Sequence, residues 1–328
     1  MSIKNRSLSC LLFLLLFFSV TFLQSSNTIS EEWPTRPVKL VVPFAAVGPT
    51  DALSRILVDR LSQELQGTFV IEYASGAGGM IGANRVASAA PDGYTLLMGS
   101  NTNFVLNQLI YREPLVDGAK DFSFVSLIAE IPRILIVRKG LQIENLEQFI
   151  SYARLNAGRL QYGSAGIGSA SHVCGLLIEK IIERKIAHVP YRGASLAIQD
   201  LLAGHIDYIP DQILTSIGLI EARQVNGVAI LGPERTRTLP YISTSEEQGF
   251  DNLDCRSWSG LAFPRGTPSR IIEKLNNALA KIVDEPSILT IYANSGALPI
   301  SKSRRGAEYF HAHVQTEIAR WRRIVKYQ

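Results

Sequence analysis

From Trp33 onward the sequence alternates short apolar runs with amphipathic stretches, and this alternation most constrains the fold. Residues 38–44 form a near-continuous apolar run, as expected for a strand that is buried on both faces. In the following stretch, apolar side chains recur at helical spacing, at Leu53, Ile56, Leu57, Leu61 and Leu65. A strand at 69–73, a helix at 80–90 and a strand at 94–99 complete a β-α-β-α-β order. This order predicts a mostly parallel sheet covered by helices.

The same alternation starts again in the second half of the chain. The predicted strands there are 134–138, 160–163, 186–191, 206–209, 228–231 and 257–263. The predicted helices are 145–156, 169–184, 194–203, 215–222, 268–283 and 304–327. Two α/β halves in one chain predict two lobes that face a cleft. Because ligands of open α/β sheets bind at the carboxyl ends of the strands, the strand-to-helix loops are the segments in which to look for a site.

The N-terminus resembles a secretory signal peptide. Lys4 and Arg6 form a positive region, and an apolar run of 13 residues follows at 11–23. This run is shorter than the roughly 20 residues that a membrane-spanning helix needs. We therefore expect residues 1–30 to be a signal peptide that is cleaved between 25 and 30, with an uncleaved anchor as the alternative. Either way the folded part is exported.

Charge and cysteine content exclude several classes of protein. The formal net charge is +4, and the basic residues form no long block interleaved with aromatic residues, so we expect no nucleic-acid partner. Outside the leader the chain has two cysteines, Cys174 and Cys255. Export permits a disulfide between them, but two buried free thiols are the favoured interpretation. Neither cysteine has a neighbour at zinc-ligand spacing, and we expect no metal site.

Three strand-to-helix junctions are rich in Gly, Ser and Thr, at residues 45–51, 99–103 and 164–172. Each of them can place backbone N–H groups and a hydroxyl or amide at the start of a helix, which favours an anion. The alternative for any one of these loops is ordinary helix capping by Thr50, Asn101 or Ser169. Three such loops at equivalent positions favour a site for a carboxylate.

Signatures of catalysis and of a nucleotide cofactor are weak. The glycine cluster at 76–82 lacks the third glycine of a dinucleotide fingerprint, because Ile81 stands there, and we expect no cofactor. No G-x-S-x-G motif occurs, and Ser169 and His172 lie within one turn of the same helix. A secreted hydrolase remains an alternative, because catalytic triads are recognised by geometry rather than by sequence.

Several motifs occur in order along the chain: Pro43-Phe44, Gly48-Pro49-Thr50-Asp51, Gly76-Ala77-Gly78-Gly79, Ala90-Pro91-Asp92-Gly93-Tyr94-Thr95-Leu96-Leu97, Tyr162-Gly163-Ser164, His188-Val189-Pro190-Tyr191-Arg192-Gly193, Asp200-Leu201-Leu202-Ala203-Gly204, Ser257-Trp258-Ser259-Gly260 and Ala319-Arg320-Trp321. Taken together, these motifs resemble the Bug family, the periplasmic solute receptors of tripartite tricarboxylate transporters. The match runs in order from about Trp33 to the end of the chain.

The resemblance implies a two-lobed α/β periplasmic binding protein, not an enzyme, that closes on its ligand by a hinge. Lobe one would comprise 31–132 and 254–328, and lobe two 133–253, joined by crossing strands near 125–136 and 255–263. The implied ligand is a small organic acid, and the implied partner is a membrane transporter; we expect a monomer. A solute sensor that signals to a membrane kinase would need the same closing cleft and remains an alternative.

The resemblance also implies a set of ligand-binding residues, held mostly through backbone amides and hydroxyls rather than through Arg or Lys. These residues are Phe44, Ala46, Gly48, Thr50, Ser100, Asn101, Ser164, Gly168, Ser169, Tyr191, Gly193 and Asp211, with His172 behind the loop at 164–169. Asp211 stands where the family often has a residue that sets specificity. The alternative for Asp211 is a solvated loop carboxylate.

The first loop departs from the family pattern. Val47 replaces one of two successive glycines, and a left-handed backbone at that position would strain valine, so we expect a loop of different shape. Met80 stands where the family often has Asn. These departures predict a more apolar rim and a less densely charged ligand, such as a monocarboxylic or aromatic acid.

Overall fold

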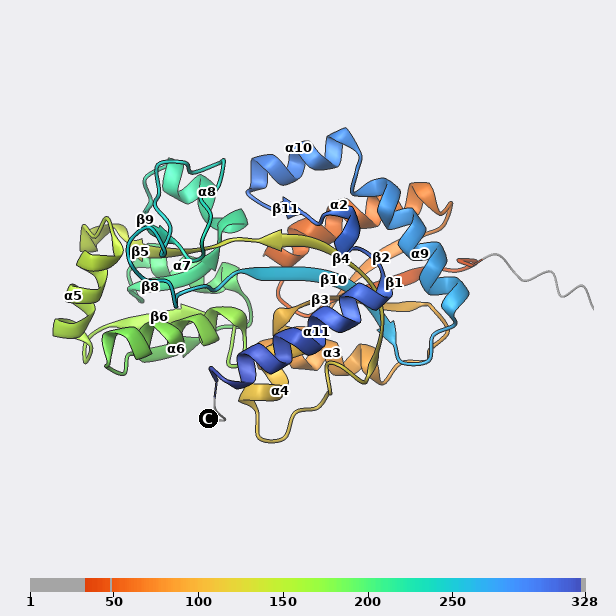
Figure 1. The fold of residues 1–328 in the computed structure, drawn as a ribbon, viewed down its shortest axis with the longest axis horizontal. Helices are drawn as coiled ribbons and strands as arrows, with labels where there is room; N and C mark the ends of the chain where they lie inside the picture. The colour runs from red at the N-terminus through yellow and green to blue at the C-terminus, as the bar shows by residue number, and fades with distance from the viewer. Residues whose placement is uncertain (1–32, 48, 326–328) are drawn as a thin grey trace, which may run out of the picture.

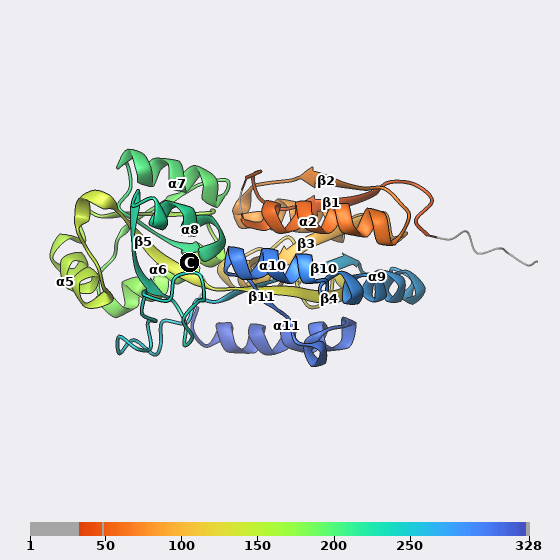
Figure 2. The ribbon, with the colours of Figure 1, turned by 90° about the horizontal axis from the view of Figure 1, so that it is seen from above.

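The computed structural model describes residues 33–47 and 49–325 of the chain. The predicted signal peptide and Gly48 lie outside the described residues. Figures 1 and 2 show two α/β lobes side by side, each built around one sheet. The predicted two-lobed α/β fold is therefore confirmed.

The elements follow one another in strand-helix alternation. The strands are β1 (Val38–Val42), β2 (Phe69–Tyr73), β3 (Thr95–Ser100), β4 (Phe122–Ile131), β5 (Arg133–Arg138), β6 (Gln161–Ser164), β7 (Ala187–Pro190), β8 (Tyr208–Gln212), β9 (Val225–Ile230), β10 (Ser257–Pro264) and β11 (Leu298–Pro299). The α-helices are α2 (Pro49–Glu64), α3 (Met80–Ala87), α4 (Asn107–Ile110), α5 (Leu146–Asn156), α6 (Ala170–Ile182), α7 (Ala194–Ala203), α8 (Ile213–Glu221), α9 (Ser269–Ile282), α10 (Pro286–Ser295) and α11 (Ala307–Arg322). Short turns of other helix types are η1 (Ala77–Gly79), η2 (Thr102–Leu106), η3 (Lys139–Leu141) and η4 (Lys302–Arg304).

The six-stranded sheet has the order β11-β4-β10-β3-β1-β2, and we call its lobe the first lobe. Its strand β1 pairs in parallel with β2 and β3, whereas β10 is antiparallel to both β3 and β4. The five-stranded sheet has the order β7-β6-β8-β5-β9, and we call its lobe the second lobe. Helices cover both sheets, which is why β1 and β10 are almost entirely apolar and buried.

The chain passes between the two sheets at two adjacent places. At the first, β4 continues into β5 through Pro132, which has no backbone N–H to donate to a sheet. At the second, the segment after β9 leads into β10, and the Cys255 N–H donates to the Leu231 carbonyl over 3.1 Å. Arg133 Nε donates to the Cys255 carbonyl over 3.2 Å and so joins the two crossings. Figure 2 shows β4 and β10 running side by side toward the second lobe.

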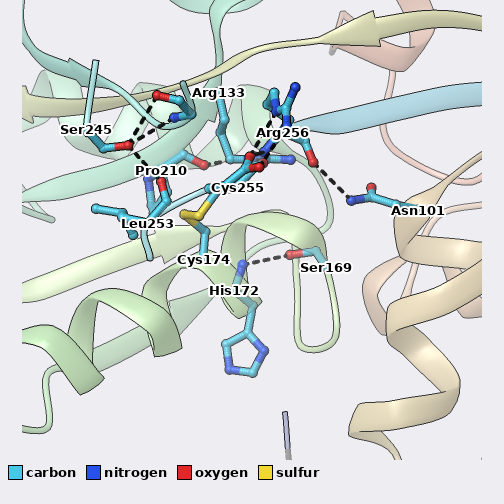
Figure 3. The surroundings of a disulfide bond; sticks show 12 residues. Asn101, Arg133, Ser169, His172, Cys174, Pro210, Ser245, Leu253, Cys255 and Arg256 are labelled. Carbon is cyan, nitrogen blue, oxygen red and sulfur yellow. Dashed lines mark hydrogen bonds and ion pairs between the residues drawn. A yellow bond between two sulfur atoms is a disulfide. The ribbon is translucent and has the colours of Figure 1, made fainter. Parts of the chain in front are cut away.

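The two cysteines form a disulfide, so the favoured interpretation as free thiols is wrong. Cys174 on α6 and Cys255 before β10 are 81 residues apart in sequence, with their Cα atoms 5.7 Å apart. Both side chains are buried, as predicted, but the fold brings them together from elements that the sequence does not relate. The bond ties the second crossing to the helix whose N-terminus faces the cleft (Figure 3).

Several elements differ from the sequence prediction, and three of the differences bear on the site or on the contact between the lobes. Strand β8 covers Tyr208–Gln212 rather than 206–209, which places Asp211 in a buried strand instead of a solvated loop. The polar segment after β3 forms the π-helical turn Thr102–Leu106, and helix α10 was not predicted. Helix α10 contributes Ile288 and Tyr292 to a core that also contains Ile213 of α8, so it packs apolar side chains between the lobes.

Candidate ligand-binding cleft

One cavity lies where the ends of β3 and β8 meet the starts of β5, α2, α6 and α7. Its lining comes from both lobes and consists of Phe44, Ala45, Thr50, Ser100, Thr102, Arg133, Ala165, Ser169, Ala170, Ser171, Ala194, Asp211 and Gln212. The space open to the centres of water molecules is about 40 Å³, on the order of three water positions. A groove of about 970 Å³ lies on the second lobe between α5 and β9, but it includes no residue of the first lobe. Closure of the lobes can enclose a solute in the cavity and not in this groove.

Five of the predicted site residues line the cavity. They are Phe44, Thr50, Ser100, Ser169 and Asp211. The residues with hydroxyl groups among them, Thr50, Ser100 and Ser169, each come from one of the three predicted strand-to-helix junctions. Ser169 is the N-cap of α6, and its Oγ accepts a hydrogen bond of 3.3 Å from the His172 N–H. The Ser171 hydroxyl lies 3.1 Å from the same oxygen, so two hydroxyls meet at this helix start.

The second-lobe loop at 164–169 is supported from behind by two imidazoles, those of the buried His172 and the half-buried His188. Ser164 Oγ lies 2.6 Å from His188 Nε2 and also accepts from the Gly166 N–H over 3.0 Å, so Ser164 holds the loop and does not line the cavity. Gly168, at φ +78°, donates its N–H to His172 Nδ1 over 3.2 Å. The rings of His172 and His188 stack with their centroids 4.2 Å apart.

Both imidazoles are neutral over the physiological pH range. Burial lowers the pKa of His172 to about 3, and the charges of His188 and Lys185 act in the same direction. Burial also lowers the pKa of His188 to about 4. A neutral His172 keeps Nδ1 as an acceptor for the Gly168 N–H. The predicted place of His172 behind the loop is confirmed.

Of the other predicted residues, Gly48 lies outside the described residues, Ala46 and Gly193 lie at contacts between the lobes, and Tyr191 bonds within the second lobe. The Ala45 N–H donates to the Arg192 carbonyl over 3.4 Å, and Gly193, the N-cap of α7, packs against Ala45. The Ala46 carbonyl accepts from Ser195 Oγ over 3.4 Å. The Tyr191 hydroxyl donates to Asp200 over 2.6 Å.

Asn101 acts at the second crossing rather than at the cavity. Its Oδ1 accepts a hydrogen bond of 2.8 Å from Ser257 Oγ, and its Nδ2 lies 3.5 Å from the Arg256 carbonyl. The cap expected of Asn101 is therefore absent, since its side chain bonds to β10 and the residue before it. Figure 3 shows this contact beside the disulfide.

The first loop adopts the backbone that a glycine would favour. Val47 has φ +62°, and its side chain is 79% exposed, so the expectation that valine would avoid this backbone is wrong. Asp51 on α2 holds the loop, because its Oδ2 accepts the Val47 N–H over 2.8 Å. Burial alone would raise the pKa of Asp51, but hydrogen bonds from Tyr73, Val47 and Arg55 lower it. Met80 is buried and does not contribute to an apolar rim.

A buried arginine and a buried glutamine line the cavity, and the sequence prediction missed both. Arg133 is 4% exposed, and its Nη1 donates to the Pro210 carbonyl over 2.9 Å. Burial lowers the pKa of Arg133 to about 10, with the Asp211 charge opposing this shift. The sequence offers one sign of this role: Arg133 directly precedes the apolar run 134–137, which predicts a buried strand. An arginine in such a place is buried with polar partners, and these can include a ligand.

Asp211 and Gln212 end strand β8, beside Arg133 in the same sheet, and both line the cavity. Asp211 Oδ2 accepts hydrogen bonds from Thr215 Oγ1 over 2.6 Å and from Ser216 Oγ over 2.8 Å. Burial raises the pKa of Asp211 above its ordinary value, while these hydroxyls and the Arg133 charge oppose the shift. Gln212 pairs with Arg133 in the register of β8 and β5.

The described part of the chain contains neither a cluster of metal-ligating side chains nor a helix that could span a membrane. Between residues 33 and 325, Gly48 excepted, no three His, Cys, Asp or Glu side chains gather as a metal ion would require. In the same residues no helix combines the length and the apolar character needed to cross a membrane.

Comparison with known proteins identifies the family of this chain. Residues 53–328 match the family described as tripartite tricarboxylate transporter family receptor. A relative from Agrobacterium vitis, encoded in the TAR-I ttuE-ttuC' intergenic region, is 31% identical over 95% of this chain and 90% of its own length. The protein BugT of Bordetella pertussis is 26% identical over 90% of both chains.

Solved structures match over nearly the whole described chain. MatC from Rhodopseudomonas palustris, solved with bound malate, has a TM-score of 0.87 and 34% identity over 90% of this chain and all of its own. A second Rhodopseudomonas palustris protein, solved with adipate, has a TM-score of 0.85 and 34% identity over the same shares. The chain therefore belongs to the receptor family of the tripartite tricarboxylate transporters, the Bug family of periplasmic solute-binding proteins.

Proposed function

We propose that this receptor captures a small carboxylate-bearing solute between its lobes and delivers it to a membrane transporter. The observation that carries the proposal is the cavity between the lobes, which is lined both by the hydroxyl residues Ser169 and Ser171 at the start of α6 and by the buried Arg133. Hydroxyl donors, a helix N-terminus and a buried cation all favour a carboxylate. The malate and adipate held by two relatives are consistent with such a ligand.

The proposed lobe boundaries follow the places where the chain changes sheets. Lobe one would comprise 31–132 and 254–328, and lobe two 133–253, with the hinge at Pro132 and at the segment before β10. Hydrogen bonds between the lobes line the cleft and would open with it. Examples are Ala170 N–H to Thr102 Oγ1 at 3.0 Å and Tyr111 OH to the Ile167 carbonyl at 2.9 Å.

A hydrolytic function is disfavoured by the position of its best candidate nucleophile. Ser164 and His188 are within hydrogen-bond distance, but Ser164 is completely buried and does not line the cavity. Among the described residues, no carboxylate bonds to His188 to orient it as a base. We therefore propose a receptor without enzymatic activity, exported to the periplasm by residues 1–30 and monomeric.

The proposal is tested by thermal unfolding of the mature protein against a panel of mono-, di- and tricarboxylates of two to eight carbon atoms. A ligand present at about 100 times its Kd adds about 2.7 kcal/mol to the free energy of unfolding. We expect a clear rise in melting temperature with at least one acid, and product analysis should show that acid unchanged. The absence of a shift with every acid, or turnover of the binding acid, would contradict the proposed function.

A further inference from the structure

The polar groups that line the cavity are of two kinds. Groups that donate hydrogen bonds come from the loops of the first lobe, from the start of α6 and from β5; they are Thr50, Ser100, Thr102, Arg133, Ser169 and Ser171. The end of β8 instead carries a carboxylate, Asp211, and an amide, Gln212. A ligand that is only a carboxylate can accept hydrogen bonds from the first group, but it has no donor for Asp211 or for the amide oxygen of Gln212.

Gln212 has an acceptor atom without a partner. Its side chain is 9% exposed and lines the cavity, yet Oε1 is buried and accepts no hydrogen bond from any described residue. A buried polar atom left without a hydrogen bond destabilises the protein, because it has lost its contact with water and gained no partner. A donor on a bound solute would remove this destabilisation, so the position of Gln212 indicates that the solute carries one.

Asp211 adds a second acceptor and a negative charge beside Gln212. Its two side-chain hydrogen bonds, from Thr215 and Ser216, both end on Oδ2, and the backbone N–H of Gln212 also interacts with the carboxylate; a carboxylate can accept about four hydrogen bonds and so retains acceptor capacity. Asp211 is 2% exposed, and the formal charges of Asp211 and Arg133 cancel within the cavity. A second carboxylate placed beside Asp211 would meet like-charge repulsion in a poorly solvated space. A hydroxyl or ammonium group in that place is attracted instead.

We propose that the solute of this cleft carries a hydrogen-bond donor, an ammonium or hydroxyl group, next to its carboxylate, and that Gln212 and Asp211 select it. In this arrangement the carboxylate faces Ser169, Ser171 and Arg133, and the donor faces the end of β8. The inference rests on the proposed function, because it assigns the substrate class of the same cavity.

The test compares acids that share a carbon skeleton and differ in one group at C2. For skeletons of three to six carbon atoms, the unsubstituted, 2-hydroxy and 2-amino acids are titrated calorimetrically into the mature protein; succinate, malate and aspartate form one such set. On the skeleton that binds most tightly, we expect a substituted acid to bind at least about tenfold more tightly than the unsubstituted one, as one donor meeting Gln212 predicts.

Variants at the end of β8 test whether Gln212 and Asp211 cause the difference in affinity between substituted and unsubstituted acids. Gln212→Met keeps the side-chain length but removes the acceptor, and it should bring the affinities of the substituted and unsubstituted acids close together. Asp211→Asn distinguishes an ammonium from a hydroxyl group on the ligand. The affinity for a 2-amino acid should fall more than the affinity for a 2-hydroxy acid, because only the ammonium group loses a partner of opposite charge. Gln199→Met, at an exposed position of α7, is the matched control and should change neither ratio.

Each outcome has one consequence. If the unsubstituted acid binds as tightly as both substituted acids, or if Gln212→Met leaves the ratio unchanged while the variant melts cooperatively, the selection by Gln212 and Asp211 is overturned and the proposed function stands. If no acid of any skeleton binds, the proposed function itself fails.

Discussion

Ser169 shows how a single side chain can serve fold and site together. Its hydroxyl caps α6 through the His172 N–H and also lines the cavity. The two roles are compatible because a hydroxyl accepts one hydrogen bond while donating another. From sequence, helix capping and ligand binding are alternative roles for this loop. In the structure Ser169 caps the helix and also lines the cavity, so one role does not exclude the other.

Ser169→Ala should lower ligand affinity by about 1–3 kcal/mol, since a buried donor to the carboxylate is lost. It should also lower the free energy of unfolding by about 0.5–2 kcal/mol through loss of the cap. Asn145→Ala is the matched control, because Asn145 caps α5 through the Gln148 N–H and does not line the cavity. Calorimetric titration should find weaker binding in the first variant alone; equal binding in both would remove Ser169 from the site.

The imidazoles of His172 and His188 predict a pH dependence of stability. Their folded pKa values of about 3 and about 4 lie below the ordinary value of 6.5, so the unfolded chain binds more protons at intermediate pH. Their contribution to stability is therefore complete above pH 6.5 and is lost progressively as the pH falls toward 4. Denaturant unfolding of His172→Gln between pH 4 and 7 should show a shallower loss than wild type. His311→Gln, at an exposed position of α11, should follow wild type.

At the scale of elements, the disulfide and Arg133 hold the second crossing. Cys255 is bonded to α6 through its sulfur, and its carbonyl accepts from Arg133 at the first crossing (Figure 3). The start of α6, which offers donors to the cavity, is thereby fixed to the segment where the chain changes sheets. Loss of the disulfide should therefore increase the mobility of the start of α6 and of the second crossing together.

Cys174→Ser/Cys255→Ser should destabilise the protein by up to about 4–5 kcal/mol, the loop-closure contribution for the 81-residue separation. Thermal unfolding in the presence and absence of a reductant measures this effect. Reductant should lower the melting temperature of wild type toward that of the double variant and leave the variant unchanged. Detection of two free thiols in the denatured, unreduced mature protein would contradict the disulfide.

Elements with a strong local pattern were predictable from sequence. Strand β2 and helix α7 match their predicted bounds, because an apolar run and a regular helical spacing identify them locally. The register of β8 was not predictable, since the placement of Asp211 in a strand depends on pairing with β5, more than 70 residues earlier. Helix α10 was missed because its apolar side chains divide between a buried and an exposed face without a clear local period.

The candidate site was predictable only in part, for the same reason. Hydroxyls at helix starts can be recognised from neighbouring residues, and three such residues, Thr50, Ser100 and Ser169, line the cavity. Arg133 escaped because the carbonyls that allow its burial belong to Pro210 and Cys255, which are 77 and 122 residues away in sequence. The pairing of the cysteines across 81 residues is another such long-range effect.

At the scale of the whole molecule, the proposed function requires two positions of the lobes. Contacts such as Ala170 with Thr102 and Ala45 with Arg192 join the lobes at the cleft and must break for a solute to enter. Within the described chain from β1 to β11, the backbone passes between the sheets only at the two crossings, and the disulfide joins α6 to the second of them at Cys255, so opening can occur by rotation there.

Small-angle X-ray scattering should therefore give a smaller radius of gyration with ligand than without it. Ligand that favours the closed arrangement shifts the population toward it. A variant that binds poorly, Arg133→Met, should keep the larger radius at the same ligand concentration. An unchanged radius in wild type at saturating ligand would show that binding does not require movement of the lobes.

The central claim is that a carboxylate binds between the lobes, and a crystal structure with the tightest-binding acid of the panel tests it most directly. The account predicts carboxylate oxygens within hydrogen-bond distance of Ser169 or Ser171 and of Arg133, with the ligand enclosed by residues of both sheets. An acid bound elsewhere, such as in the groove between α5 and β9, with this cavity unchanged, would contradict it.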